Sequence, residues 1–168
     1  MLFIFFLFFE IFLIFFAIYF LFSLVRKTPF YPSKIKSLDE IFNKIEIKGK
    51  NFIDIGSGDG RIVIWAAERG FNADGIEYNP FLTILSKIKI FFLRLNKKVR
   101  IYNKDFFDHS YSDYQIVYMF IYSEQMDKLQ NKLFRELKPN SVIISNTFNF
   151  SEVKEDRKIG NYYVYYIK

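Results

Sequence analysis

The first 25 residues constrain the fold of this chain more than any other part of it. Twenty of them are Leu, Ile, Phe or Val, and Glu10 is their only charged residue. A helix of this length is about 37 Å long, which exceeds the roughly 30 Å hydrocarbon core of a bilayer. Glu10 either faces a partner helix in the bilayer or is tolerated in its protonated form. We therefore expect residues 2–25 to form one transmembrane helix, within an anchor of residues 1–27.

A cleaved signal peptide is the alternative for this segment. A signal peptide carries basic residues before its apolar run and a small-residue cleavage site after it. Here no Lys or Arg precedes the run, and Arg26, Lys27, Lys34 and Lys36 follow it. The positive-inside rule then predicts a single-pass membrane protein whose domain, residues 28–168, lies on the cytoplasmic side.

The composition excludes several kinds of site. The chain has no Cys and one His, so disulfides, thiolate zinc sites, cysteine nucleophiles and multi-histidine metal sites are not expected. The net charge of +6 would suit nucleic acid, but it also suits an anionic inner leaflet. The frequent Ile, Lys, Asn, Tyr and Phe are typical of AT-rich codon usage, which explains part of the Lys excess. We therefore expect no metal and infer no nucleic-acid partner from charge.

Residues 28–168 show strand signals that alternate with helix signals. A capping box at Ser37 and Glu40 predicts the start of one helix, and Asn79 followed by Pro80 predicts the start of another. Helices are also expected at 61–69, closed by Gly70, and at 123–137. Strands are expected at 51–55, 72–77, 98–102, 115–121, 141–148 and 161–167. This alternation predicts an α/β domain with a mostly parallel sheet and helices on both faces.

A Gly-rich turn, Asp54-Ile-Gly-Ser-Gly-Asp-Gly60, joins the first expected strand to a helix. Its three glycines, Gly56, Gly58 and Gly60, allow a sharp turn and a close approach of the backbone to a ligand. The dinucleotide fingerprint would require Gly or Ala at the position of Arg61, so a nicotinamide enzyme is the weakest alternative.

Two acidic residues follow the next two expected strands. Glu77 ends the second strand, where a carboxylate accepts hydrogen bonds from two ribose hydroxyls. Asp105 follows the third strand, where it would reach an adenine amino group, and Phe106 would stack on the ring.

These residues and motifs together resemble the class I S-adenosylmethionine-dependent methyltransferases over residues 29–168. D-I-G-S-G-D-G-R, G-I-E-Y-N-P, K-D-F-F and the L-K-P-N turn carry the resemblance. The residues of these motifs most resemble those of the small membrane-anchored protein-lysine methyltransferases that modify membrane proteins. That branch usually has a Trp near Asp105, where this chain has Phe106 and Phe107. The resemblance implies a Rossmann-like fold and S-adenosylmethionine as cofactor, held by Asp54, Gly56, Ser57, Gly58, Gly60, Glu77, Asp105 and Phe106.

The acceptor side of the site has weaker signals. Tyr122 and Ser123 follow the fourth expected strand, and Tyr31 lies in the Pro-containing connector, so we expect these three near the acceptor. Residues 120–123 do not match the N-P-P-Y type motif of nucleic-acid amine methyltransferases, which argues against a nucleic-acid acceptor. His109 lies in a polar turn and is expected at the surface rather than as a base.

The resulting functional hypothesis is a membrane-anchored methyltransferase that acts on a protein lysine. A lipid or small-molecule acceptor is the alternative within the same chemistry, and a non-catalytic cofactor-binding membrane adaptor is the alternative from another class. The segment from Lys87 to Arg100 holds six basic residues and no acid. It is either a core helix with a basic solvated face or a contact to an anionic leaflet.

Overall fold

The computed structural model describes residues 2–26 and 35–168, except the side chains at 18–26, 36, 123 and 124. The chain divides into two compact units, residues 1–32 and residues 33–168. In the first unit, α1 (Leu2–Arg26) confirms the expected helix. Within the described residues, no helix was found that is both long and apolar enough to cross a membrane, so the membrane anchor stays a prediction. The predicted acceptor residue Tyr31 lies outside the described residues.

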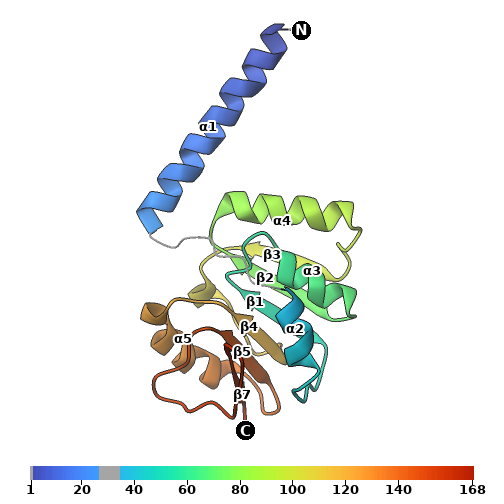
Figure 1. The fold of residues 1–168 in the computed structure, drawn as a ribbon, viewed down its shortest axis with the longest axis vertical. Helices are drawn as coiled ribbons and strands as arrows, with labels where there is room; N and C mark the ends of the chain where they lie inside the picture. The colour runs from blue at the N-terminus through green and yellow to red at the C-terminus, as the bar shows by residue number, and fades with distance from the viewer. Residues whose placement is uncertain (1, 27–34) are drawn as a thin grey trace. The chain divides into compact units, whose positions relative to one another are not determined.

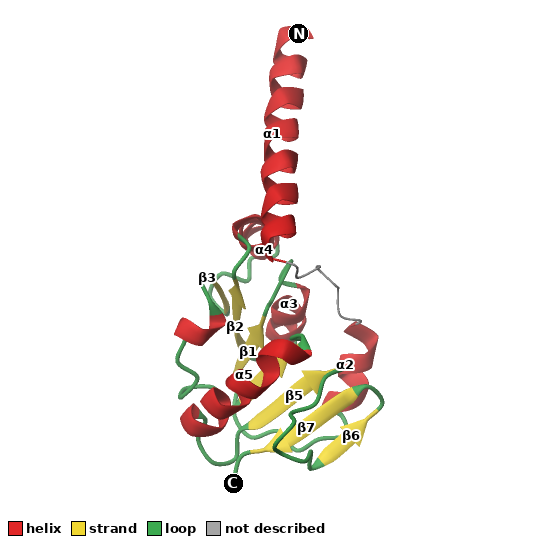
Figure 2. Cartoon of the chain, turned by 90° about the vertical axis from the view of Figure 1, so that its left-hand side faces the viewer, coloured by secondary structure: helices red, strands yellow, loops and turns green. Residues whose placement is uncertain are grey.

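The second unit is built on one seven-stranded sheet with the strand order β3-β2-β1-β4-β5-β7-β6 (Figures 1 and 2). Strands β1 to β5 run parallel, and β7 pairs antiparallel with both β5 and β6. The expected mostly parallel sheet is therefore confirmed, with a mixed edge. The strands are β1 (Asn51–Ile55), β2 (Asn72–Glu77), β3 (Val99–Asn103), β4 (Ile116–Met119), β5 (Val142–Asn146), β6 (Arg157–Ile159) and β7 (Tyr162–Tyr166).

Helices cover both faces of this sheet because its central strands are apolar on both sides. The helices α2 (Ile35–Phe42), α3 (Arg61–Glu68) and α4 (Pro80–Phe92) pack on one face. The helix α5 (Ser123–Glu136) and the 3-10 turn η1 (Phe106–Asp108) cover the other. In the described connection between β3 and β4, η1 is the only helical element.

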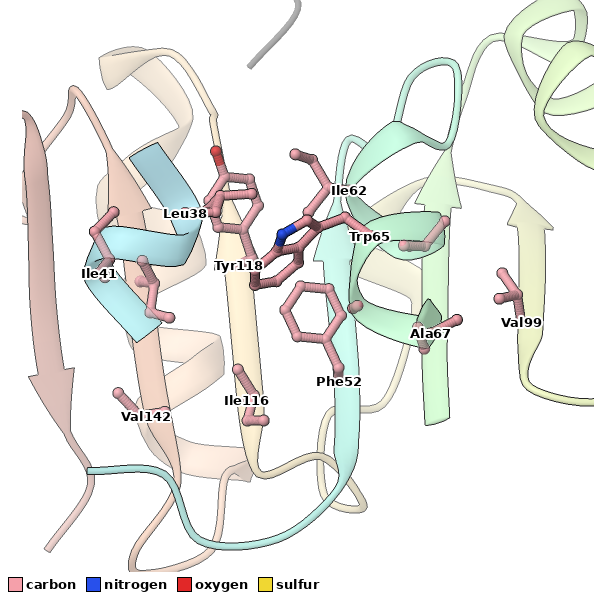
Figure 3. Close-up of a cluster of buried hydrophobic side chains, with 14 of the residues drawn as sticks. Leu38, Ile41, Phe52, Ile62, Trp65, Ala67, Val99, Ile116, Tyr118 and Val142 are labelled. Atoms are coloured by element: carbon pink, nitrogen blue, oxygen red, sulfur yellow. The ribbon is translucent and has the colours of Figure 1, made fainter. Parts of the chain in front are cut away.

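The larger core lies under α2 and α3. Trp65 of α3, Phe52 of β1 and Tyr118 of β4 lie beside one another in it (Figure 3). The Phe42 ring meets the Trp65 ring edge to face, with 4.7 Å between centroids. The Trp65 indole N–H donates to Asp39 at 3.1 Å, so the one polar atom of this large side chain has a partner. These contacts fix α2 and α3 against the strand that leads into the Gly-rich turn.

Several local predictions are confirmed by the backbone. Asn79 caps α4, since its side chain accepts hydrogen bonds from the N–H groups of Phe81 and Leu82. Gly70 closes α3 with a φ of 90°. Asn140, in the L-K-P-N turn, has a left-handed φ of 70°, which Asn tolerates.

Other local predictions were wrong. The capping box at Ser37 does not form, because α2 already begins at Ile35. Ser37 instead bonds to the Tyr162 hydroxyl at 2.9 Å, and Glu40 pairs with Lys44 one turn later. The short edge strand β6 was not predicted, since its three residues carry no alternating apolar pattern.

The strand order places the end of β1 at the point where the sheet changes direction. The chain goes from β1 outward to β2 and β3, then returns to β4 on the other side of β1. In such sheets ligands bind beyond the carboxyl ends of the strands at this switch point. The turns after β1, β2, β3 and β4 all leave the sheet at this edge, which therefore contains the candidate site.

Candidate active site

The Gly-rich turn leaves β1 in a conformation that only glycine adopts freely. Gly56, Gly58 and Gly60 have φ angles of 76°, 54° and 79°. The N–H groups of Gly56 and Ser57 both donate to the Ile76 carbonyl at 2.9 Å, which ties the turn to β2. Because an L side chain is strained at these angles, the three glycines are required by the path of the backbone.

Gly75 of β2 has a different role under the same turn. A Cβ atom at Gly75 would lie 2.7 Å from the Ser57 hydroxyl, closer than such atoms approach. The Ser57 side chain is buried, and its hydroxyl has no hydrogen-bond partner among the described residues. Ser57, predicted to bind cofactor, thus packs down onto β2.

Glu77 links two backbone segments at the end of β2. One carboxylate oxygen accepts from the Gly58 N–H at 2.8 Å, and the other accepts from the Asn79 N–H at 2.7 Å. Burial raises the pKa of Glu77, and these backbone hydrogen bonds oppose the rise. A carboxylate accepts about four hydrogen bonds, so both oxygens keep acceptor capacity for ligand hydroxyls. The structure brings Glu77 and the Gly-rich turn together as predicted.

Asp54 occupies the last but one position of β1 and is only 3% exposed. Burial raises its pKa well above the usual value, and the nearby carboxylates of Glu77 and Asp59 raise it further. The site therefore contains a buried carboxyl that resists ionisation while no cation is beside it.

Asp59 was not singled out in the sequence, yet it organises the second half of the turn. Its carboxylate accepts from Arg61 at 2.9 Å and from Lys89 of α4 at 2.6 Å. Burial would raise the pKa of Asp59, but the hydrogen bonds from Arg61 and Lys89 outweigh it and lower that pKa to about 2. The two ion pairs attach the turn to α4. The signal in the sequence was the pair of opposite charges at positions 59 and 61.

Asp105 and Phe106 lie at the same edge, directly after β3. The Asp105 carboxylate accepts from the Phe107 N–H at 2.9 Å and so caps η1. Phe106 is half-buried, and its ring lies 4.5 Å from the Phe107 ring between centroids. The predicted adenine-side residues are thus placed by a one-turn helix, and their contact with an adenine stays a prediction.

The predicted acceptor-side residues are only partly described. Tyr122 stands at the N-cap of α5, is 40% exposed, and packs its ring 5.7 Å from that of Phe148. The Ser123 backbone begins α5, while its side chain is outside the description. Tyr122 and Ser123 follow β4 at the switch point, so their backbone position agrees with the prediction.

The prediction that His109 lies at the surface was wrong, because its side chain is buried. Its Nε2 lies 3.1 Å from the Tyr114 hydroxyl, which donates to Asp74 at 2.7 Å. Burial, followed by the charge of Lys104, lowers the pKa of His109. These contacts lead to Asp74 near the start of β2, rather than to Glu77 at its carboxyl end.

The residues of this edge fit an adenosine-containing cofactor. The exposed backbone at Gly56 permits close approach, and the Glu77 carboxylate is oriented by two backbone donors. Asp54 adds a buried carboxyl that a cationic group would favour in its charged form. Among the described residues there is no cluster of His, Cys, Asp and Glu that could hold a metal ion.

Solved structures define the class of this fold. The chain superposes on an RNA methyltransferase from Salinibacter ruber, solved with S-adenosyl-L-homocysteine, with a TM-score of 0.76 and 26% identity. The match covers 82% of this chain and 94% of that one. An S-adenosylmethionine-dependent methyltransferase from Geobacter sulfurreducens, at 20% identity and a TM-score of 0.57, shares the fold, with 71% of this chain and 49% of that one covered. The second unit therefore has the Rossmann-like fold of S-adenosylmethionine-dependent methyltransferases.

Sequence comparison then gives the family. The chain belongs to the ANTKMT methyltransferase domain family, whose profile matches residues 54–157. A human lysine N-methyltransferase named for a subunit of ATP synthase is 33% identical over 132 residues, covering 79% of this chain and 57% of that protein. The mouse adenine nucleotide translocase lysine N-methyltransferase is 27% identical, covering 73% of this chain and 54% of that protein. A protein-lysine N-methyltransferase of Saccharolobus islandicus is 29% identical, covering 75% and 80%.

The chain thus spans little more than half the length of its human and mouse relatives. The resemblance to protein-lysine methyltransferases that the motifs indicated is confirmed at the level of family and fold.

Proposed function

We propose that this protein is an S-adenosylmethionine-dependent methyltransferase that transfers a methyl group to the side-chain amine of a lysine in a protein. The observation that carries the proposal is Glu77, whose carboxylate is held between the N–H groups of Gly58 and Asn79 beside the Gly-rich turn. The names of the related lysine methyltransferases support lysine as the acceptor.

The protein's own contribution to this reaction is to bind and align. The cofactor, when bound, would supply a methyl group that is already activated by a positively charged sulfur. The lysine amine would have to lose its proton to solvent before it could accept that group. Glu77 would hold the ribose hydroxyls, and the Gly-rich turn would pass closely under the ligand. Alignment of this kind supplies much of the rate enhancement when the reactive group is already activated.

Asp54 would respond to the positive charge of the cofactor. Its buried carboxyl resists ionisation in the free protein, because burial raises its pKa. A cation beside it favours the charged form, so cofactor binding and the ionisation of Asp54 are coupled. Asp105 and Phe106 would contact the adenine, and Tyr122, Ser123 and Tyr31 would lie on the acceptor side.

We also propose that α1 anchors the protein in a membrane through residues 2–25 and that the methyltransferase domain lies on the cytoplasmic side. The support is the apolar sequence of α1 and the basic residues that follow it. An anchored enzyme has a high local concentration of acceptors in the same membrane, so we propose a membrane protein as the substrate.

A labelled-methyl transfer assay tests this function. Full-length protein is incubated with membranes and S-adenosylmethionine labelled on its methyl group, and the label is followed in protein, lipid and nucleic-acid fractions. We expect label in protein, recovered as methyl-lysine after hydrolysis, and its loss with Glu77→Gln. The matched variant Glu68→Gln, at an exposed position of α3, should keep the activity.

Each other outcome has a distinct meaning. Label in extractable lipid or in small molecules would show that the acceptor is a lipid or a small molecule and not a protein lysine. Label in RNA would overturn the protein acceptor altogether. Binding of S-adenosylhomocysteine without transfer to any fraction would favour a non-catalytic membrane adaptor.

A further inference from the structure

The helix α4 has an inverted distribution of side chains. Its buried residues are Thr83, Ser86 and Ile90, two of which are small and polar. Five of its large apolar side chains instead point outward and are between 42% and 77% exposed: Ile84, Leu85, Ile88, Phe91 and Phe92. Their spacing of one, three and four residues places them along a single face of the helix. The domain therefore carries a continuous apolar stripe on the outside of α4.

The inversion is enforced by the Gly-rich turn. A Cβ atom at Gly60 would lie 2.7 Å from the Ser86 Cβ, so the turn passes directly under α4. The Thr83 hydroxyl donates to the Glu77 carbonyl at 3.3 Å, and Lys89 pairs with Asp59. These contacts fix the rotation of α4, so it cannot turn its apolar side chains inward without breaking the candidate site.

The charge around this stripe has one sign. No Asp or Glu occurs between Pro80 and Lys104. Lys89 forms an ion pair with Asp59. No ion pair among the described residues involves the four exposed basic residues Lys87, Arg94, Lys97 and Lys98. Arg94 adopts a left-handed φ of 57°, so the chain turns sharply there and the last three of these residues follow in the loop after α4 (Figure 1).

We propose that α4 and the basic turn after it, residues 84–98, dock on an anionic bilayer surface. An outward apolar stripe beside exposed Lys and Arg is the composition of a helix that lies in the membrane interface. The uncompensated positive charge complements anionic headgroups, and this single-sign charge favours lipid over a second copy of the chain, whose own residues 84–98 would repel it. We call residues 84–98 the α4 surface.

Docking through the α4 surface has a consequence for the candidate site. α4 starts three residues after Glu77. A lipid contact along α4 would therefore also set how the cofactor-binding edge of the domain is oriented toward the bilayer. The inference goes beyond the proposed function, because it concerns the orientation of the domain and holds for any methyl acceptor.

Site-directed spin labelling tests the α4 surface, and the absence of native Cys makes each label unique. A nitroxide is attached to Ile88→Cys in the full-length protein, and to Asn131→Cys on the exposed side of α5 as the matched control. The labelled proteins are bound to phosphatidylcholine vesicles with and without phosphatidylglycerol. Collision with oxygen and with a water-soluble nickel chelate reports whether each label lies in lipid or in water.

We expect the Ile88 label to become shielded from the chelate and accessible to oxygen in vesicles that contain phosphatidylglycerol, while the Asn131 label stays in water. Comparison with Lys87→Gln, Lys97→Gln and Lys98→Gln tests the charge. The ratio of lipid-immersed to aqueous Ile88 label should fall about fivefold for each basic residue removed, the equivalent of about 1 kcal/mol per contact.

Two results would overturn the proposal. One is an Ile88 label that remains as accessible to the chelate as the Asn131 label on anionic vesicles. The other is immobilisation of the Ile88 label in detergent solution without vesicles, which would indicate that protein, such as a second copy of the chain, covers the stripe. A thermal shift with S-adenosylhomocysteine, measured on the same labelled proteins, separates either failure from a failure of the methyltransferase function.

Discussion

Glu77 and Asp54 lie at the same edge of the sheet, but their surroundings differ. Two backbone N–H groups donate to Glu77 and partly compensate its burial. Asp54 is more deeply buried, and among the described residues no hydrogen bond to its carboxyl compensates for that burial. Glu77 is therefore oriented before a ligand arrives, while Asp54 is destabilising until a positive charge is placed beside it.

The substitution Asp54→Asn should stabilise the ligand-free protein at pH 7. The pKa of Asp54 is raised in the folded state. At a pH below the pKa of Asp54 in the unfolded chain, the carboxyl is protonated in both states and does not lower the free energy of unfolding. As the pH rises through the raised pKa, the native state must either keep a proton or bury a charge, and stability is lost. We therefore expect Asp54→Asn to raise the free energy of unfolding at pH 7, because the neutral amide brings no charge that the native state must bury.

Urea unfolding of both proteins between pH 3 and pH 8 measures this gain, and the two curves should converge at the acid end. Asp108→Asn, at an exposed position of η1, should leave the stability within experimental error. A destabilising effect of Asp54→Asn at pH 7 would contradict the prediction.

The substitution Glu77→Gln should weaken cofactor binding. A Gln side chain presents one NH₂ group where Glu77 has an acceptor, and that group would face either the Gly58 or the Asn79 N–H. A hydrogen bond to a charged group is worth about 1.5–3 kcal/mol, which corresponds to a loss of roughly 10- to 100-fold in affinity. Calorimetric titration with S-adenosylhomocysteine measures it, with Glu68→Gln as control. Equal affinities would remove Glu77 from the ribose site.

At the scale of elements, the Gly-rich turn is the contact point of α4 and β2. Gly75 leaves room for Ser57 from one side, and Gly60 leaves room for Ser86 from the other. The turn is therefore packed between two elements as well as being bent, and Gly60 has two independent reasons to be glycine.

Comparison of two Ala variants separates these reasons. Gly60 and Gly70 both have left-handed φ angles, 79° and 90°, so either change to Ala costs about 1–2 kcal/mol. Only at Gly60 would the new methyl group meet a neighbour, Ser86, whereas nothing lies within 4 Å at Gly70. We expect Gly60→Ala to cost a further 1–3 kcal/mol or so, as overpacking does. Guanidinium unfolding measures both, and an equal cost would show that the turn is free to move away from α4.

Sequence reasoning found the elements whose signals are local. The strands β1 and β2 agree with their predicted limits to the residue, because apolar runs bounded by turn residues define them. It failed where distant partners decide. Ser37 bonds to Tyr162, which is 125 residues away, instead of capping a helix. The Asp59–Lys89 ion pair and the burial of His109 were missed for the same reason. Lys89 comes from α4, and Asp74 of β2 accepts from the Tyr114 hydroxyl that lies against His109.

At the scale of the whole molecule, the two compact units differ in how they are held together. Both hydrophobic clusters of the second unit consist of residues from position 38 onward. The described residues of the first unit supply no member to either cluster. The stability of the methyltransferase domain and the proposed attachment to a membrane are thus assigned to different segments of the chain.

Deletion of residues 1–32 should therefore separate folding from access to substrate. The melting temperature of the shortened protein is expected to stay within about 2 °C of the full-length value, since none of the described residues that it loses belongs to either hydrophobic cluster. A change of about 1 kcal/mol shifts a domain of this size by a few degrees. Its affinity for S-adenosylhomocysteine should also be unchanged.

The effect of the deletion should appear only when the acceptor is in a membrane. Tethering to the same bilayer raises the effective acceptor concentration, and its loss typically reduces apparent affinity by roughly 100-fold or more. Methyl transfer to acceptor in vesicles should fall accordingly, while transfer to the same acceptor in detergent should be kept, because the catalytic edge is intact. If both rates fell together with the melting temperature, α1 would be a structural part of the domain. If neither rate changed, the membrane anchor would have no part in presenting the substrate.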